Sequence, residues 1–384
     1  MDCEWSGPLP FAPRWDEVKG SQVPDVVVVG AGIVGAAIAY QAARRGAAVT
    51  LVDTSLPGSG ATGDSFAWIG IHGDVPGAAA NLHAAALDAY RALEVDVPGV
   101  RVRWTGSLSW PAPAVSPSAL AGRESAGPRE DVHVLDAAQA AQVEPNLRRP
   151  PDRAVHTTSD AAVDPVAVTE ALVRAARGHG CEVRIGVTAT ALRSRRGLVI
   201  GLDTSAGFLP ADSVVVAAGV GVPLLCAPLG FDVPVAPSPA VLMRFDPPND
   251  VVRTLVASPQ LEVRQGRDGE LLATGGPEAQ ASRSDVEQAA KGTRAMIAAT
   301  FVGADTVQSR SARVGVRPMP VDGTPIVGPL PGVRGVYLAV MHSGVTLAPV
   351  VGHLVAEEIL TGRQAVQLAG CRPARFTREP TSAH

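Results

Sequence analysis

The chain has few of the residues that build disulfide frameworks and metal centres. Its four cysteines in 384 residues are scattered and form no CxxC pair, and no histidine spacing matches them. We therefore expect neither a disulfide framework nor a zinc site. We interpret Cys3, Cys181, Cys226 and Cys371 as free thiols in a reducing cytosol.

Basic character and long apolar runs are also missing. Only two of the 33 cationic residues are lysines, and the formal net charge is −4. This charge argues against a nucleic-acid partner, which would require a basic face. The head of the chain lacks the basic and apolar regions of a signal peptide, and glycines interrupt the apolar run 26–39. We expect a cytoplasmic protein with no membrane partner.

What is present is an ordinary globular composition, with 46% hydrophobic and 18% charged residues. The length allows a large core and two structural lobes. Short β-branched runs near 25–30, 48–52 and 214–219 alternate with alanine-rich helical segments, whereas the segments 233–245, 251–256, 260–265 and 270–274 are typical of antiparallel strands. The pattern predicts an α/β nucleotide-binding domain interrupted by an antiparallel lobe.

The strongest motif is a GxGxxG sequence between a predicted strand and a predicted helix. It reads Gly30-Ala31-Gly32-Ile33-Val34-Gly35, directly after the valine run 26–29. The first glycine permits a tight turn, the second admits a pyrophosphate close to the backbone, and the third allows close packing of helix on strand. The N-terminus of the helix offers N–H donors to the phosphates.

An acid at the end of the next strand completes the dinucleotide-binding pattern. Asp53 lies 18 residues after Gly35, where a carboxylate accepts hydrogen bonds from ribose hydroxyls. A carboxylate at this place also repels a 2′-phosphate, which disfavours NADP. The motif alone does not separate FAD from NAD.

Three further segments resemble the FAD-dependent D-amino acid oxidase and glycine oxidase family, which includes the sarcosine oxidase-like enzymes. The first is the small-residue loop 60–72, with Thr62 and Trp68. The second joins the apolar run 214–219 to Leu-Leu-Cys-Ala-Pro-Leu-Gly at 224–230. The third runs from Gly-Val-Arg-Pro at 315–318 through Asp-Gly-Thr-Pro at 322–325 to the segment 342–349. The resemblance therefore covers residues 25 to about 360.

The resemblance implies a Rossmann-type FAD-binding domain with an inserted antiparallel-sheet substrate domain, as in glycine oxidase. We expect 24–76, 150–232 and 312–371 to form the FAD-binding domain, and 77–149 and 233–311 the substrate-binding domain. The FAD is expected to be non-covalent, because the place of the flavin-linking cysteine in covalently flavinylated relatives is taken by Val314, Gly315 and Val316.

The family match and the GxGxxG motif together predict the residues that contact FAD. They are Gly30, Ala31, Gly32, Ile33, Val34, Gly35, Asp53, Thr54, Ala61, Thr62, Phe66, Ala67, Trp68, Val187, Ala218, Gly219, His342, Ser343, Gly344, Val345 and Thr346. In the last segment we expect the backbone N–H groups and the helix dipole, more than the His342 imidazole, to stabilise charge on reduced flavin. We do not assign His342 as a general base. His72 either contacts substrate or caps a turn.

Arg317 matches the carboxylate-binding arginine of the family and is our main candidate for substrate binding. A planar guanidinium holds a carboxylate in bidentate geometry and so orients the C–H bond next to nitrogen. The alternative for Arg317 is a structural ion pair at a strand end, and we interpret the neighbouring Arg313 in that way.

Four more residues are candidates for the substrate pocket, each with a structural alternative. Trp68 either walls the pocket or packs in the core. The place of a family aromatic falls on Glu262 or Leu261. Glu262, Arg264 beside it and Arg244 either reach the pocket or are solvated strand residues.

The expected function is oxidation of an amino acid or an N-substituted glycine, that is, a secondary amine with a carboxylate, and specialised biosynthesis is one setting for it. Hydride transfer to flavin, hydrolysis of the resulting imine and formation of hydrogen peroxide from oxygen would together cleave the C–N bond. One alternative is a dehydrogenase that passes electrons to a quinone or another acceptor. The other is a non-catalytic FAD-binding subunit of an oxidase complex. The sequence leaves the substrate and the oligomeric state open.

Overall fold

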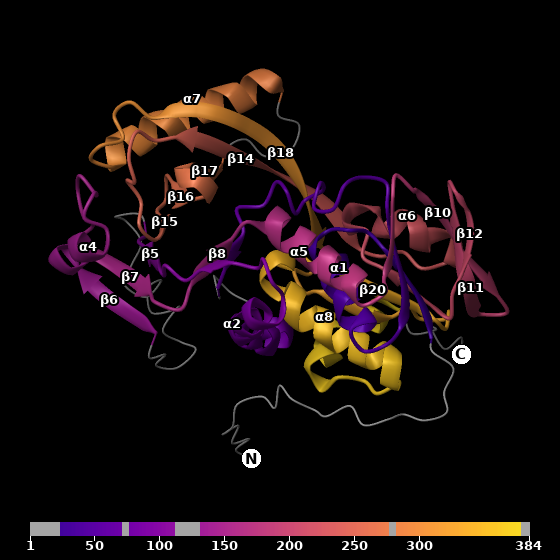
Figure 1. Cartoon of the computed structure of the whole chain (residues 1–384). Helices are drawn as coiled ribbons and strands as arrows, with labels where there is room; N and C mark the ends of the chain where they lie inside the picture. Colours follow the sequence, from indigo (N-terminus) through magenta and orange to yellow (C-terminus); the bar gives the residue numbers. More distant parts are fainter. Residues whose placement is uncertain (1–23, 71–76, 112–130, 276–281, 378–384) are drawn as a thin grey trace, which may run out of the picture.

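The structure is a computed structural model that describes residues 24–70, 77–111, 131–275 and 282–377. The expectations for the leader 1–23, for Cys3, for His72 and for nearly all of the loop 111–130 lie outside these residues. The described chain contains two large sheets. One includes the strand that precedes the GxGxxG motif, and the other lies in the lobe at the upper left of Figure 1.

The first sheet has six strands in the order β19-β20-β13-β1-β2-β9, all parallel except β19. The central strand β1 is buried over four successive valines, because a parallel strand is covered on both faces. The bounds are β1 (Asp25–Val29), β2 (Ala48–Asp53), β9 (Glu182–Ile185), β13 (Ser213–Val216), β19 (Ile326–Pro329) and β20 (Val336–Val340).

Different layers cover the two faces of this sheet. On one face Val26 and Val28 pack in a core with the helices α1, α2, α5 and α8. On the other face Val27 and Val29 pack with α6 and a small antiparallel sheet of β10, β11 and β12. The bounds are α1 (Ile33–Ala43), α2 (Gly77–Asp96), α5 (Pro165–Gly178), α6 (Val222–Cys226), α8 (Gly344–Thr361), β10 (Ala189–Arg195), β11 (Leu198–Thr204) and β12 (Gly207–Pro210).

The second sheet has eight strands in the order β18-β14-β17-β16-β15-β5-β7-β6, and α7 packs on it with a separate core. The long strand β18 pairs with β14 along its length and runs from beneath α7 toward the first sheet (Figure 1). The bounds are β5 (Ser107–Ser109), β6 (Val132–Asp136), β7 (Arg153–Thr157), β14 (Val235–Asp246), β15 (Leu255–Ala257), β16 (Glu262–Gln265), β17 (Leu271–Gly275), α7 (Arg283–Thr300) and β18 (Gln308–Pro320).

A small sheet of β3, β8 and β4 joins the two lobes. Here β8 (Ala161–Val163) pairs with both β3 (Trp68–Ile69) and β4 (Val102–Arg103). The short helix α4 (Ala137–Val143) follows β6. The predicted fold class is confirmed, since a parallel sheet covered by helices and a second sheet, antiparallel except for the pair β15–β5, are both present.

Some predicted domain boundaries differ from the structure. The helix α2 packs in the core of the first sheet through Leu82, Tyr90 and their neighbours, although it was predicted to belong to the substrate domain. The strand β7 pairs with β5 and β6 in the second sheet, although it was predicted to belong to the FAD domain. The chain passes between the two lobes more often than its composition indicates. Domain boundaries drawn from the sequence therefore assign α2 and β7 to the wrong lobe.

One described helix, α8, is long and apolar enough to span a membrane by length and composition. It packs against α1 and α2, and 61% of its apolar window is buried inside the protein. A buried helix of this kind is typical of a protein core.

Candidate active site

A cavity of about 1200 Å³ lies at the carboxyl end of the parallel strands and continues to the edge of the second sheet. Open α/β sheets commonly bind ligands beyond these strand ends. Pockets for drug-sized molecules measure about 300–1000 Å³. The cavity therefore has room for a ligand larger than a typical metabolite.

Most of the predicted cofactor residues line this cavity. They are Gly30, Gly32, Ile33, Val34, Asp53, Thr54, Ala61, Thr62, Phe66, Ala67, Trp68, Val187, Ala218, Gly219, His342, Ser343, Gly344, Val345 and Thr346. Ala31 and Gly35 lie behind the lining. Ala31 is fully buried, and its N–H donates to Asp53 Oδ2 at 2.6 Å. Gly35 packs against the carbonyl of Gly30. Both residues therefore support the conformation of the glycine turn without lining the cavity.

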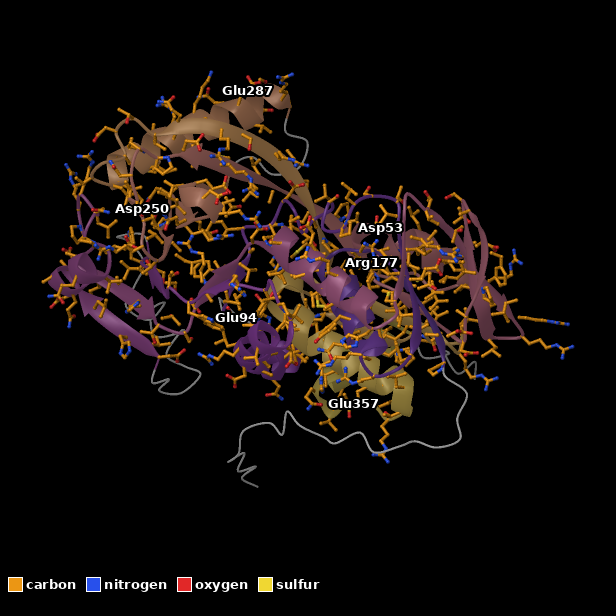
Figure 2. The ribbon with its side chains drawn as sticks, viewed as in Figure 1. Asp53, Glu94, Arg177, Asp250, Glu287 and Glu357 are labelled. Atoms are coloured by element: carbon orange, nitrogen blue, oxygen red, sulfur yellow. The ribbon has the colours of Figure 1, made fainter. Side chains whose placement is uncertain are left out.

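The glycine turn has the geometry that the motif requires. Gly30 has φ +105°, and a β-carbon on it would lie 2.5 Å from the carbonyl oxygen of Ala217. Thr62 Oγ1 accepts a hydrogen bond from the N–H of Ile33 at 3.1 Å, which fixes the loop after β2 against the start of α1. Asp53 ends β2 (Figure 2) and orders the loop through Ser55 N–H as well as Ala31 N–H.

Two helix N-termini face the same cavity. Neither Gly32 before α1 nor Ser343 before α8 caps its helix through a side-chain hydrogen bond, and the first turn of each helix contains no acidic residue. The N–H groups of such a turn and its partial positive charge favour an anion. One end of the cavity therefore suits a pyrophosphate, and the start of α8 suits a ring that gains negative charge.

The substrate end of the cavity contains Arg317. Its Nη2 donates to Ser238 Oγ at 2.8 Å, and its Nε donates to the Ser238 carbonyl at 3.4 Å. Ser238 lies opposite Arg317 in the β14–β18 pair, so the strand register fixes the guanidinium. Among the lining residues that the structure describes, Arg317 is the only arginine or lysine.

Trp68 and Glu262 also line the cavity, from opposite lobes. Trp68 Nε1 donates to Asp160 Oδ2 at 3.1 Å, and the Trp68 carbonyl accepts from Thr346 Oγ1 at 3.1 Å. These bonds hold the Trp68 ring at the cavity with its edge toward Phe66, at a centroid separation of 6.3 Å. Trp68 is therefore part of the cavity wall.

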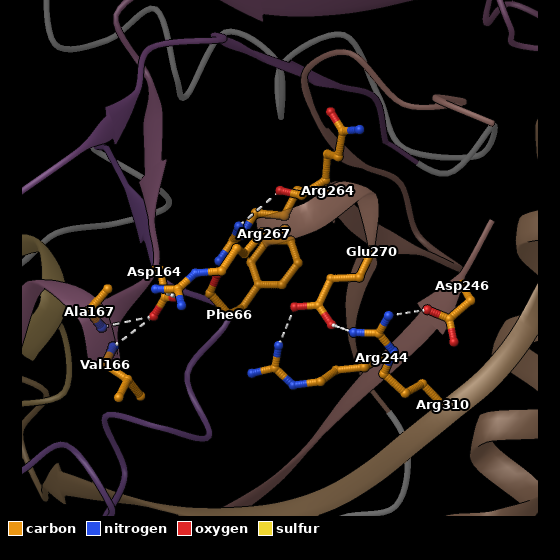
Figure 3. A network of polar contacts seen from close by, with 12 residues as sticks. Phe66, Asp164, Val166, Ala167, Arg244, Asp246, Arg264, Arg267, Glu270 and Arg310 are labelled. Carbon is orange, nitrogen blue, oxygen red and sulfur yellow. Dashed lines mark hydrogen bonds and ion pairs between the residues drawn. The ribbon is translucent and has the colours of Figure 1, made fainter. Parts of the chain in front are cut away.

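The structure does not bring Arg244 or Arg264 to the cavity lining. Arg244 Nη1 lies 2.5 Å from Oε1 of Glu270, a carboxylate that also pairs with Arg310 (Figure 3). Arg264 is 3% exposed, and its guanidinium donates to backbone carbonyls between the two lobes. Arg313 lies 3.3 Å from Asp64 and is largely exposed, as a structural ion pair would be.

His83 and Asp64 are among the lining residues that the sequence analysis did not predict. His83 is 7% exposed on α2, its pKa is lowered chiefly by burial, and its Nδ1 has no hydrogen-bond partner. Burial raises the pKa of Asp64, and the cations Arg313 and Arg244 oppose that shift. The signal for His83 was a polar side chain on the otherwise apolar stripe of a helix, between Leu82 and Leu87.

His342 directly precedes Ser343, the N-cap of α8, and interacts electrostatically with Arg317 and His83. Burial lowers its pKa most, and the charges of Arg317 and His83 lower it further. A neutral imidazole at neutral pH leaves Arg317 as the positive charge at this end of the cavity.

Comparison with known proteins supports the dinucleotide site. Residues 25–358 match the family model described as FAD dependent oxidoreductase. The chain belongs to this family. The predicted family, the cofactor FAD and the oxidoreductase class are therefore confirmed, and the glycine turn and the two helix N-termini at the cavity fit a dinucleotide.

Three similar proteins span most or part of the chain. Glycine oxidase of Bacillus licheniformis is 27% identical over 350 residues, which cover 88% of this chain and 93% of that protein. D-amino acid dehydrogenase of Cereibacter sphaeroides is 33% identical over 239 residues, which cover 60% and 54%. The structure of glycine oxidase from Geobacillus kaustophilus has a TM-score of 0.81 at 23% identity, covers 92% of this chain and 99% of its own, and supports the fold.

Proposed function

We propose that the protein is a cytoplasmic FAD-dependent oxidase of an amino acid or an N-substituted glycine. The observation that carries the proposal is the placement of Arg317. It is the only cation among the described lining residues, and it lies in the same cavity as the N-terminus of α8 and the ring of Trp68. A carboxylate is the ligand that a guanidinium fork binds in bidentate geometry.

Each part of the cavity then has a role in orienting the substrate. Ser238 engages one side of the Arg317 guanidinium, and the remaining N–H donors are available to a carboxylate. Phe66, Trp68 and Met341 form an apolar wall that excludes water from the reacting carbon. Ser343 to Thr346 line the cavity at the start of α8, where the helix dipole would stabilise negative charge on the cofactor ring.

Bound FAD would supply the hydride acceptor for the C–H bond next to nitrogen, which is the difficult part of the chemistry. The chain itself supplies position: Arg317 at the carboxylate and the wall around the amine-bearing carbon. Water then hydrolyses the released imine, and the C–N bond is cleaved.

The FAD is proposed to be non-covalent. No cysteine lies among the described residues of the lining. At Gly315, one of the three residues that take the place of the flavin-linking cysteine, a β-carbon would lie 2.5 Å from Cβ of Asp64, so the packing there leaves no room for a cysteine side chain.

The test is aerobic turnover of a panel of N-alkyl glycines, glycine and D-amino acids by the purified holoprotein. We expect hydrogen peroxide together with glyoxylate or the corresponding oxo acid. If no member of the panel produces an oxo acid with any electron acceptor, the proposal is wrong.

A second candidate is a dehydrogenase that passes electrons to a quinone, which the similarity to D-amino acid dehydrogenase favours. Reduced holoprotein would be mixed with air-saturated buffer or with a soluble quinone. Faster reoxidation by oxygen supports the oxidase, and faster reoxidation by the quinone supports the dehydrogenase.

A further inference from the structure

Arg264 is a buried cation between the two lobes, and no carboxylate of the described residues lies within ion-pair distance of it. Its side chain extends from β16 of the second sheet and is 3% exposed. Its charge is met by backbone carbonyls: Nε donates to Phe66 at 2.6 Å, Nη2 to Val163 at 3.0 Å and Nη1 to Gln265 at 3.0 Å. The guanidinium carbon also lies 5.3 Å from the centroid of the Phe66 ring (Figure 3).

Burial, with a smaller contribution from the neighbouring cations Arg103 and Arg244, lowers the pKa of Arg264 to about 9. The group therefore remains charged at neutral pH. A buried charge without a carboxylate partner is destabilising unless its donors are satisfied. The presence of the charged Arg264 side chain at the lobe interface therefore indicates a role that an apolar side chain would not fill.

The segment that Arg264 holds is strained. Ala67, the residue after Phe66, has φ +56°, which places it in the left-handed region that alanine rarely adopts. This kink directs both Phe66 and Trp68 to the cavity lining. Arg264 bonds the carbonyl before the kink and the Val163 carbonyl, and the N–H of Val163 in turn donates to the Ala67 carbonyl at 3.3 Å.

We propose that Arg264 is a positioning residue: it holds the left-handed kink at Ala67, and so presents the Phe66 and Trp68 rings to the substrate face of the flavin. The sequence analysis considered Arg264 as a direct substrate ligand, but its guanidinium lies outside the cavity lining. It acts through the backbone of Phe66. The expected effect of Arg264 on the reaction rests on the proposed amine oxidation. Its effect on the position of the Phe66 and Trp68 rings at the flavin does not.

The experiment compares R264M, A67G and the double variant R264M/A67G with the wild-type holoenzyme. Glycine adopts the left-handed region without strain, so a chain with Gly at position 67 keeps the kink without the guanidinium. The matched control is R310M, which removes an arginine of the same polar network that touches Glu270 and Asp246 but not the 66–68 segment.

Two readouts separate positioning from stability. The visible circular dichroism of bound FAD reports the asymmetry of its surroundings, and anaerobic mixing with an active amine gives the rate of flavin reduction. In R264M we expect an altered dichroism band and a reduction rate lower by about tenfold to a hundredfold, because displacement on the ångström scale has effects of that size. In R264M/A67G both should return toward wild type. R310M should match wild type within about twofold.

The proposal is overturned if R264M has wild-type dichroism and reduction rate, or if A67G restores neither in the double variant. Should R264M give no soluble flavoprotein, the double variant must give it, and its failure also overturns the proposal. If no amine reduces the wild-type flavin, the proposed function is lost, while the dichroism of the variants still decides the role of Arg264.

Discussion

Gly35, in the first turn of α1, packs directly against the backbone carbonyl of Gly30, and a β-carbon on Gly35 would overlap that oxygen. The two glycines thus bring strand β1 and helix α1 close together, and Gly30 and Gly32 of the turn between them line the cavity. The first and third glycines of the motif are therefore coupled by contact.

G35A is expected to abolish retention of FAD and to destabilise the fold, because the overlapping atom belongs to backbone that has no room to move. G178A is the matched control, since a β-carbon on Gly178 meets nothing within 4 Å. Flavin absorbance after gel filtration and thermal unfolding measure the two effects. Equal flavin content in both variants would contradict this account of the turn.

D53A is expected to weaken FAD binding by about tenfold to a hundredfold, the size of a lost hydrogen bond to a charged group. The loss has two sources, the ribose contact and the bonds from Ala31 and Ser55 that order the loop. Recovery of FAD fluorescence on dilution gives the dissociation constant. D152A, at an exposed aspartate away from the cavity, should bind FAD as wild type does.

His353 on α8 predicts a pH effect on stability. Burial, with the charges of Arg45 and Arg44, lowers its pKa from 6.5 to about 4. Between these values the unfolded chain binds a proton that the folded chain does not, so His353 removes stability as pH falls from 6.5 to 4. About a third of the side chain is exposed, and solvent screening moderates the effect.

The measurement is denaturant unfolding of wild type and H353Q across this range. The variant loses the hydrogen bond between His353 and Arg45 at every pH, but it should gain stability relative to wild type as the pH falls. Parallel stability curves for the two proteins from pH 7 to pH 4 would show that His353 is not the group responsible.

A buried ion pair distant from the cavity predicts a stability effect. Glu358 on α8 is nearly buried and pairs with Arg372 at 2.5 Å, while Tyr337 of β20 donates to the same carboxylate. R372M leaves this carboxylate buried without its cation and should lower the free energy of unfolding by about 3–5 kcal/mol. Urea unfolding would show it, and a loss below about 1 kcal/mol, the usual worth of an exposed pair, would contradict it.

The sequence predicted those parts of the site that depend on local spacing. The turn at Gly30 and the acid at Asp53 are each set by a short stretch of chain, whereas Arg317 was predicted from the family resemblance, and all three lie at the cavity. The placements of Arg244 and Arg264 in the pocket were wrong, because they depend on how far a strand continues beyond the cavity.

Two strands illustrate the failures. Glu262 lines the cavity, but Arg264, two residues along the same face of β16, lies about 6–7 Å farther on, against the first lobe. On β14, Ala240 lines the cavity and Arg244 reaches Glu270 instead. Alternation predicts the face of a strand, but the boundary of the cavity depends on the packing of two lobes.

The most direct test of the central claim is anaerobic reduction of the bound flavin by matched amines with and without a carboxylate, in wild type and in R317A. N-methylglycine against dimethylamine, and glycine against methylamine, are suitable pairs. The account predicts that wild type is bleached by the acids and that R317A loses this preference for the carboxylate. A protein that retains no flavin, or an R317A variant with an undiminished preference for the acids, would contradict it.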